Sequence, residues 1–188
     1  MKNNKETYWS QFATDFEEKQ SFVAGKEVLL LTYKEVLNES NLGKVLELGC
    51  GTGLYTKYLQ KVSNEIIATD FSDEMIETAK QKRGDLENVN FIKANALDLQ
   101  YDDESFNTIF MANLIHIIED PEEVIRESKR VLKSGGKIII TSFAADQMSF
   151  FNKISIAYRY IKTFGKPSKE SVKVKTTKEN IESLLINN

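Results

Sequence analysis

The stretch Lys44-Val-Leu-Glu-Leu-Gly-Cys-Gly-Thr-Gly53 decides the fold of this chain. Its first half is a short apolar run that predicts a buried strand, and its glycines predict a tight turn. Apolar residues recur at helical spacing from Leu54 to Leu59, so we expect a helix after the turn. At such a junction, backbone N–H groups and the helix dipole can meet a ligand, which glycine allows to approach closely.

The spacing of the glycines distinguishes two kinds of nucleotide site. A dinucleotide fingerprint reads Gly-x-Gly-x-x-Gly. This turn reads Gly49-x-Gly51-x-Gly53, and Leu54 stands where the third dinucleotide glycine would fall. Glu47 precedes the turn, and a carboxylate there suits a ligand that carries an ammonium group or hydroxyls better than a pyrophosphate.

A second acidic residue stands where it could reach the same ligand. The run Glu65–Thr69 predicts another short buried strand, and Asp70 ends it about 20 residues past the glycine turn. An acid at this place can accept hydrogen bonds from both ribose hydroxyls of an adenosine. The alternative is that Asp70 is only a turn residue, because Ser72 is a good N-cap for the next helix with Met75 at N3.

The motif Glu-Leu-Gly-Cys-Gly-Thr-Gly resembles the first motif of the class I S-adenosylmethionine-dependent methyltransferases. The segment Arg130–Gly136 is similar to the Arg-Val-Leu-Lys-Pro-Gly-Gly of a small-molecule group in that superfamily, which includes ubiquinone and menaquinone methyltransferases. The resemblance covers residues 40–142. It implies an α/β fold with a doubly wound, mainly parallel sheet of Rossmann-like methyltransferase type and strand order 3-2-1-4-5. Because the chain stops at Asn188, we expect the family's closing antiparallel hairpin to be missing or truncated.

The resemblance also implies the cofactor and the residues that hold it. The cofactor would be S-adenosyl-L-methionine and the product S-adenosyl-L-homocysteine. The cofactor-binding residues would be Glu47, Gly49, Cys50, Gly51, Asp70, Phe71, Met75, Asn95, Ala96 and Asn113. Asn95 stands where similar enzymes carry Asp, but its side chain still offers a carbonyl acceptor to the adenine amino group, and Asp98 is the competing candidate. Phe71 and Met75 would flank the adenine, although Met75 suits the core equally well.

His116 is the candidate general base. It follows the predicted fourth strand, Thr108–Ala112, at the edge where open α/β sheets bind ligands, and histidine titrates near neutral pH. The alternative is a histidine that caps or bridges its own loop, and Tyr8 and Tyr158 are weaker candidates. A sulfonium methyl group is already activated, so the reaction would be an in-line displacement that needs no metal, and a base only where the acceptor loses a proton.

One domain is the natural count for 188 residues, with three parts. Residues 7–39 predict two helices broken at Gly25, which either cover the sheet or close over the cofactor as an aromatic lid. Residues 40–142 would form the cofactor-binding core, and residues 143–188 a substrate-cap helix and a last helix.

Short sequence signals also predict where several helices and strands begin and end. We expect Asp120 and Pro121 to begin a helix over 122–132, which the glycines at 135 and 136 end. Towards the C-terminus we expect an aromatic helix over 148–164, a loop at 166–168, a short strand at 170–175 and a helix N-capped by Thr177.

Composition limits the partners. The formal net charge of −3 argues against non-specific binding to nucleic acid, and no apolar segment is long enough for stable membrane insertion. A single cysteine, Cys50, and a single histidine provide neither a disulfide framework nor a zinc ligand set, so we expect a cytoplasmic protein without a metal.

Acceptor and oligomeric state are less constrained. Lysines crowd the region after Phe150 and could form a basic rim around an anionic or apolar small-molecule acceptor; a solvated helix face is the alternative. The chain would be a monomer or homodimer. Two other functions stay open: a non-catalytic S-adenosylmethionine-binding or regulatory module, and an NAD(P)-dependent oxidoreductase.

Overall fold

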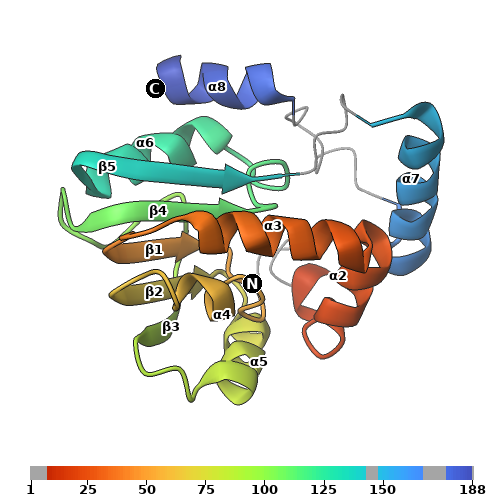
Figure 1. The fold of residues 1–188 in the computed structure, drawn as a ribbon, viewed down its shortest axis with the longest axis horizontal. Coiled ribbons are helices and arrows are strands. Elements are labelled where there is room, and N and C mark those ends of the chain that lie inside the picture. The colour runs from red at the N-terminus through yellow and green to blue at the C-terminus, as the bar shows by residue number, and fades with distance from the viewer. Residues whose placement is uncertain (1–7, 143–147, 167–176, 188) are drawn as a thin grey trace.

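A five-stranded parallel sheet forms the centre of the computed structural model, which describes residues 8–142, 148–166 and 177–187 (Figure 1). The sheet order is β3-β2-β1-β4-β5, and every neighbouring pair is parallel. The strands are β1 (Lys44–Leu48), β2 (Glu65–Asp70), β3 (Val89–Lys93), β4 (Phe106–Ala112) and β5 (Leu132–Thr141). This confirms the predicted fold class and strand order, and the described residues add no antiparallel strand to the sheet.

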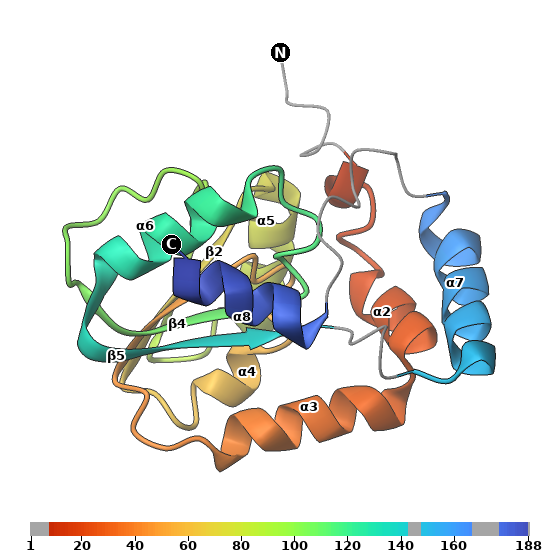
Figure 2. The same ribbon diagram turned by 90° about the horizontal axis from the view of Figure 1, so that it is seen from above.

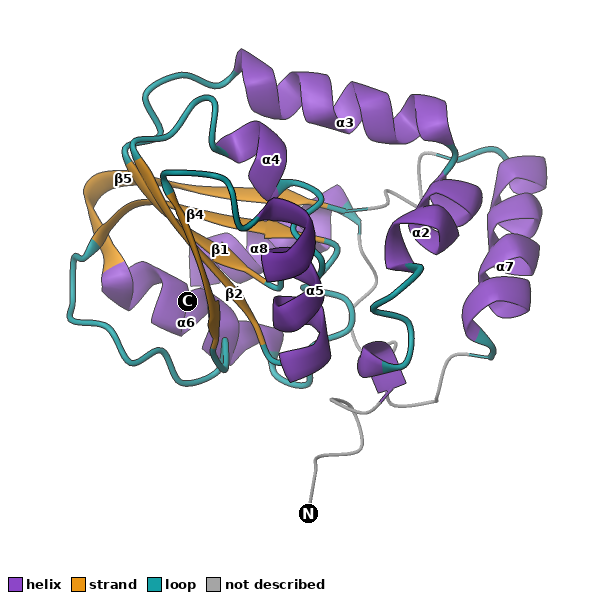
Figure 3. Ribbon diagram, turned by 90° about the horizontal axis from the view of Figure 1, so that it is seen from below, coloured by secondary structure: helices purple, strands orange, loops and turns teal. Residues whose placement is uncertain are grey.

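Helices cover both faces of the sheet (Figures 2 and 3). One face packs against α3 (Lys26–Asn38), α4 (Thr56–Leu59) and α5 (Asp73–Arg83). The other face packs against α6 (Pro121–Val131) and α8 (Lys178–Asn187). Two further helices, α2 (Phe16–Ala24) and α7 (Phe150–Phe164), pack against each other beyond the carboxyl ends of the strands, toward which the arrows in Figure 1 point.

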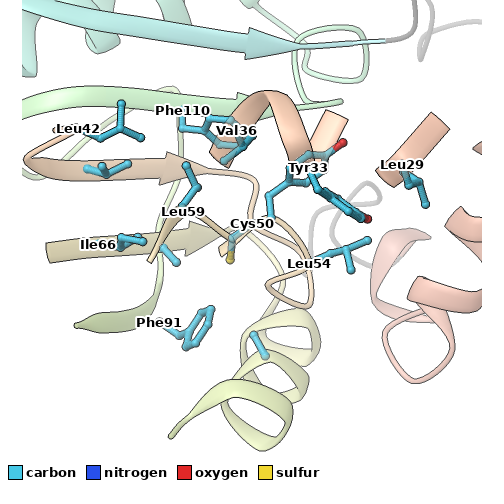
Figure 4. Packing of buried hydrophobic residues seen from close by; sticks show 14 of the residues in the cluster. Leu29, Tyr33, Val36, Leu42, Cys50, Leu54, Leu59, Ile66, Phe91 and Phe110 are labelled. Atoms are coloured by element: carbon cyan, nitrogen blue, oxygen red, sulfur yellow. The ribbon is translucent and has the colours of Figure 1, made fainter. Parts of the chain in front are cut away.

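Strand β1 shows why the sequence forms a sheet that is covered on both sides. Successive side chains of a strand point to opposite faces. Val45 therefore joins the cluster under α3 to α5, whereas Leu46 and Leu48 join the cluster under α6. Figure 4 shows the first cluster, in which Phe110 of the neighbouring strand β4 lies beside Val36 of α3, whereas Ile66 of β2 lies farther from that helix. Two buried faces produce the nearly continuous apolar run that is typical of parallel strands.

The predicted break at Gly25 is confirmed, but α2 begins only at Phe16, and residues 11–15 before it form turns. Helices α2 and α3 meet at Gly25, whose φ of 90° lies in the left-handed region that favours glycine. Helix α8 follows Thr177, whose hydroxyl accepts a hydrogen bond from the Asn180 N–H at 3.2 Å, as expected for the N-cap. Residues 167–176, on which most of the expected loop and the expected short strand fall, lie outside the described residues.

The prediction that glycine ends α6 was wrong. The helix does begin after Asp120 with Pro121 in its first turn, but it ends at Val131, and β5 begins at once with Leu132. Leu132 pairs with Phe106, and the register between β4 and β5 shifts before Thr108, so the two glycines lie inside the strand at this irregularity. A Cβ atom on Gly136 would lie 2.8 Å from the Asn107 carbonyl oxygen, so close backbone packing requires the glycine.

Candidate functional site

The glycine loop and the end of β2 form one site at the carboxyl edge of the sheet. The Gly51 N–H donates to Asp70 Oδ2 at 2.8 Å, and the Ser72 N–H donates to Asp70 Oδ1 at 2.9 Å. The Cys50 N–H donates to the Thr69 carbonyl at 2.8 Å, which ties the same loop to β2. The Asp70 carboxylate therefore faces the glycine loop, with one oxygen toward the loop and the other toward the start of α5.

The surroundings of Asp70 shift the pKa of its carboxyl in two opposite directions. Burial raises the pKa of this carboxyl, whereas hydrogen bonds from the backbone of Ser72, Gly51 and Phe71 lower it, and the net shift is upward. Each oxygen can still accept a further hydrogen bond, because a carboxylate oxygen has two lone pairs. Asp70 is thus a fixed acceptor that gains from a ligand's hydroxyl donors.

Glu47 lies beneath the loop as a second carboxylate. Its side chain is buried, and its Oε2 accepts a hydrogen bond from the Thr56 hydroxyl at 2.6 Å. Burial raises the pKa of Glu47 to about 7, and the nearby Asp70 charge adds to this shift. Two acids with raised pKa values at one place favour a ligand that carries positive charge, because a cation relieves the cost of ionising them.

The loop backbone depends on glycine at its first position. Gly49 has a φ of 68°, and a Cβ atom there would lie 2.9 Å from a methyl carbon of Leu114. Leu114 belongs to the segment after β4, so the two loops of the central strands touch at this point. A side chain on Gly49 would be strained by its backbone conformation and would also displace Leu114.

The N-terminal segment is fastened onto the loop by a clamp of three residues: Glu17 of α2, Thr52 of the loop and Arg83 of α5. Arg83 Nη1 and Nη2 donate to Glu17 Oε1 and Oε2 at 3.0 and 3.1 Å. Arg83 Nη1 also donates to the Thr52 carbonyl at 2.7 Å, and the Thr52 hydroxyl donates to Glu17 Oε1 at 3.2 Å. The Glu17–Thr52–Arg83 clamp therefore joins three elements that lie far apart in the sequence.

The positive charges around Glu17 favour its ionised form. Burial raises the pKa of Glu17, but the hydrogen bonds and charges of Arg83 and Lys82 outweigh it, and the pKa lies below its usual value. The Arg83 side chain is only 9% exposed, so its bidentate ion pair is shielded from water. Next to the clamp, the position of a Cβ atom on Gly51 lies 3.5 Å from the Phe16 ring, so α2 begins directly over the glycine loop.

Aromatic side chains hold the N-terminal segment against the end of α7. Trp9, Phe12 and Phe16 all contact the ring of Phe164, with centroids 5.1 to 6.3 Å apart. The Tyr8 hydroxyl donates to the Phe164 carbonyl at 2.6 Å. These residues bring the predicted N-terminal aromatics together with α7 at the carboxyl edge of the sheet. Most of the other large apolar side chains of α7, however, are exposed on its outer face and do not contribute to this cluster.

The residues expected around adenine differ in accessibility. Phe71 is 37% exposed beside Asp70, and Lys93 Nζ lies 5.8 Å from its ring centroid. Met75 is only 2% exposed, so it offers little surface to a ligand in this form of the protein. Asn95 is exposed, and its side-chain Oδ1 accepts a hydrogen bond from the Leu97 N–H at 3.1 Å in a local turn. Ala96 packs against the core cluster under α6.

The loop after β4 carries Asn113 and His116. Asn113 has a φ of 54°, and its N–H donates to the Thr141 carbonyl at 2.8 Å, which ties this loop to the end of β5. His116 Nδ1 lies 3.5 Å from the Ser142 hydroxyl. Burial lowers the pKa of His116 to about 4, so the ring is neutral near pH 7 and one of its nitrogens is free to act as an acceptor.

A separate hollow of about 270 Å³ lies between α3 and the edge of the sheet. Val36 of α3, Phe110 of β4 and Ile139 of β5 are among the residues that line it. None of the predicted site residues lines this hollow. Within the described ranges, no group of three or more His, Cys, Asp or Glu side chains could hold a metal ion.

Sequence reasoning missed the clamp and the contact of Leu114 with Gly49. Glu17 and Arg83 are 66 positions apart and follow no periodic pattern, so no sequence signal joins them. Thr52 lies inside the glycine motif, and its complete burial could have been suspected only from that position.

Comparisons with known proteins agree with this geometry. A family model described as a methyltransferase domain matches residues 46–140, which is half of the chain. The chain belongs to this methyltransferase domain family. The matched residues contain the glycine loop, Asp70 and all of the other predicted site residues, including His116. The family assignment confirms the resemblance to the class I S-adenosylmethionine-dependent methyltransferases.

Individual relatives are similar to this methyltransferase domain over part of their length. The demethylmenaquinone methyltransferase of Clavibacter sepedonicus is 33% identical over 101 residues, which are 54% of this chain and 41% of that protein. A protein of the same name from Staphylococcus epidermidis is 29% identical over 141 residues, which are 71% of this chain and 58% of that protein. The chain thus spans about half the length of the curated relatives it matches.

A solved structure shares the fold almost throughout. A structure from Thermotoga maritima, described as an S-adenosylmethionine-dependent methyltransferase and possible histamine N-methyltransferase, has a TM-score of 0.70 at 22% identity. The likeness covers 96% of this chain and 79% of that one. It therefore includes the helices on both sides of the predicted site.

Proposed function

We propose that this chain binds S-adenosylmethionine between the glycine loop and Asp70 and transfers its methyl group to a small-molecule acceptor. The observation that carries the proposal is the contact of the Asp70 carboxylate with the Gly51 N–H at 2.8 Å. That contact puts the acid suited to ribose hydroxyls beside the loop suited to close backbone approach. The family assignment supports the same cofactor.

Each part of the site has a separate role in holding the cofactor. Asp70 accepts hydrogen bonds from the ribose hydroxyls, and Glu47 lends negative charge beneath the loop that favours the cationic amino-acid part. The loop residues Gly49, Cys50 and Gly51 permit close approach to the backbone. The remaining contacts come from Phe71, Asn95, Ala96 and Asn113, whereas Met75, which is only 2% exposed, belongs to the core.

The cofactor, when bound, supplies a methyl group already activated on a sulfonium. The protein's own contribution is therefore orientation and exclusion of water rather than polarisation of the methyl group. The N-terminal segment, fastened by the Glu17–Thr52–Arg83 clamp, covers the loop and keeps water from the site. His116 takes a proton from an acceptor that must lose one, and it is neutral at the start of such a step because its pKa is about 4.

An apolar small molecule is the acceptor that we favour. The curated relatives named above are demethylmenaquinone methyltransferases, and the aromatic cluster around Phe164 lies at the same edge of the sheet as the loop. We expect the protein to act on such an acceptor in the cytoplasm, as a monomer or a homodimer. The single buried cysteine, Cys50, needs no oxidising compartment.

Calorimetry and an activity screen test the proposal together. The protein should bind S-adenosylhomocysteine and should not bind NADH; the reverse result would overturn the cofactor assignment. Quinols, catechols, amines and carboxylates should then be supplied with S-adenosylmethionine, and release of S-adenosylhomocysteine should be measured. Tight binding without release from any acceptor class would contradict methyl transfer and leave a non-catalytic binding module.

A further inference from the structure

Helix α7 exposes an apolar stripe on its outer face. The α7 stripe consists of Phe150, Phe151, Ile154, Tyr158 and Ile161, whose exposed fractions range from 45% to 81%. Positions that repeat at three and four residues lie on one side of a helix. A contiguous exposed stripe with two phenylalanines is costly in water, and such surfaces mark sites of interaction.

The fold does not need the α7 stripe. Other residues of the helix make the internal contacts: the Phe164 ring packs against Trp9 and Phe12, and the Tyr160 ring lies 5.3 Å from that of Phe164. Figures 1 and 2 show α7 on the outer side of α2, farther from the sheet than α2 itself. The α7 stripe therefore faces away from the rest of the molecule.

Lysines border the α7 stripe on its own helix. Residues 150–166 contain no Asp or Glu. Lys153 and Lys162 lie on either side of the stripe by helical spacing, Lys166 follows the helix, and none of the three has an ion-pair partner among the described residues. Arg159 differs, because its guanidinium donates to the Phe22 carbonyl of α2 at 3.0 Å and is held toward the protein.

We propose that α7 docks this protein on a bilayer that contains anionic lipids. The helix would lie in the plane of the interface, with the α7 stripe in the boundary between head groups and acyl chains and Lys153, Lys162 and Lys166 at the lipid phosphates. Amphipathic helices with aromatic residues on one face and lysines beside them bind membranes in this way. The association is peripheral, since no described helix is both long enough and apolar enough to cross a bilayer.

Charge favours a bilayer over a second copy of this chain. Two copies paired through α7 in a symmetric dimer would bring their lysines close together, and the helix offers no carboxylate to offset this repulsion. An anionic bilayer offers negative phosphates and an apolar interior at the same surface. The lysines beside the α7 stripe would then contact the phosphates, while its apolar side chains contact the bilayer interior.

Vesicle binding tests the proposal with the full chain. The protein should float with vesicles of phosphatidylcholine and phosphatidylglycerol, bind vesicles of pure phosphatidylcholine much more weakly, and lose binding as salt is raised. Removing each lysine's charge should weaken binding about fivefold, so Lys153→Gln with Lys162→Gln should cost about 25-fold. The pair Phe150→Ser with Phe151→Ser should cost on the order of 100-fold.

Matched controls separate docking from general loss of charge or apolar surface. Leu31→Ser removes a residue of α3 that is 61% exposed, and Lys61→Glu changes a lysine far from α7; neither should alter vesicle binding. All variants should unfold at the same temperature as the natural chain, because every substituted side chain is exposed. The assay involves no methyl transfer, so its outcome is independent of the proposed function.

Three outcomes would overturn the proposal. The first is absence of binding to phosphatidylglycerol vesicles at low salt. The second is binding that the phenylalanine pair and the lysine pair leave unchanged. The third is a lipid-independent dimer in sedimentation that the phenylalanine pair abolishes, which would assign the α7 stripe to self-association instead.

Discussion

Glu47 and Asp70 set the electrostatics of the site at the scale of single residues. Both carboxyls have raised pKa values, chiefly because of burial, but they differ in access. Glu47 is enclosed and held by the Thr56 hydroxyl, whereas Asp70 is partly buried and turned to the loop. Glu47 therefore acts on a ligand through its charge, whereas Asp70 can accept hydrogen bonds from the ligand directly.

Glu47→Gln should stabilise the ligand-free protein at alkaline pH. The pKa of Glu47 is about 7 in the folded protein and 4.5 ordinarily, so its contribution to stability is fully present below pH 4.5 and is lost as pH rises through 7. Glutamine cannot ionise and can still accept from Thr56. Urea unfolding at pH 8 should therefore give the variant a higher free energy of unfolding, by on the order of 2 kcal/mol, and little gain at pH 5.

Glu77→Gln is the matched control for this experiment, because Glu77 is an exposed carboxylate on α5. It should leave the pH dependence of stability unchanged. A Glu47→Gln variant that is no more stable than the natural chain at pH 8 would contradict the raised pKa.

His116→Gln should slow methyl transfer without weakening cofactor binding. With an acceptor that must lose a proton, kcat should fall about 100-fold, the lower end of what a general base contributes. The affinity for S-adenosylhomocysteine by calorimetry should change less than twofold. Ser142→Ala, which removes the hydroxyl 3.5 Å from Nδ1, should have a smaller effect on kcat. An unchanged kcat in the glutamine variant would leave His116 as a loop residue only.

The Glu17–Thr52–Arg83 clamp is the main feature at the scale of elements. It connects α2, the glycine loop and the end of α5, and its arginine is nearly enclosed. A buried charge that loses its partner is costly, since it keeps its desolvation without the compensating attraction. The clamp therefore makes the position of the N-terminal segment depend on the shape of the loop.

Glu17→Gln should both destabilise the protein and weaken cofactor binding. The variant keeps the size of the side chain but leaves the Arg83 charge without its counter-ion, so we expect a loss of roughly 2 kcal/mol in urea unfolding. The affinity for S-adenosylhomocysteine should fall about tenfold, because the loop and its cover are no longer held together. Lys82→Ala is the control: Lys82 also contacts Glu17, but it is exposed, and the expected loss is below about 1 kcal/mol. Equal effects of the two variants would argue against the clamp.

The sequence predicts elements well where local patterns decide them. The strand of the glycine motif, the strands at 65–69 and 108–112, the break at Gly25 and the N-caps Ser72 and Asp120 all follow from short stretches, and the structure confirms each. The end of α6 does not follow from its own sequence. Pairing of Leu132 with Phe106, 26 residues earlier, overrides the preference of glycine for a helix end.

The candidate site is predictable only in part, for a similar reason. Gly51 and Asp70 follow the pattern of a glycine turn with an acidic residue about 20 positions later, and their hydrogen bond agrees with this pattern. The clamp is absent from such patterns, because it depends on how α2 lies over the loop. The outward orientation of the α7 stripe likewise depends on which side of the helix packs against the N-terminal aromatics.

At the scale of the whole molecule, the carboxyl edge of the sheet and α7 lie on the same side (Figure 1). The edge carries the glycine loop, Asp70 and His116, and α2 separates it from α7. A membrane-docked α7 would hold the edge of the sheet close to the bilayer, where apolar acceptors concentrate. The two proposals are therefore compatible, although each has its own test.

Titration of the protein with S-adenosylhomocysteine in a calorimeter tests the central claim most directly, with Asp70→Ala and Asp73→Ala compared side by side. Asp73 is an exposed carboxylate three residues away that pairs with Lys93, so it controls for loss of charge near the site. We predict that the natural chain and Asp73→Ala bind one equivalent with similar affinity, and that Asp70→Ala binds at least tenfold more weakly. Equal affinities in all three proteins would contradict the placement of the cofactor between the glycine loop and Asp70.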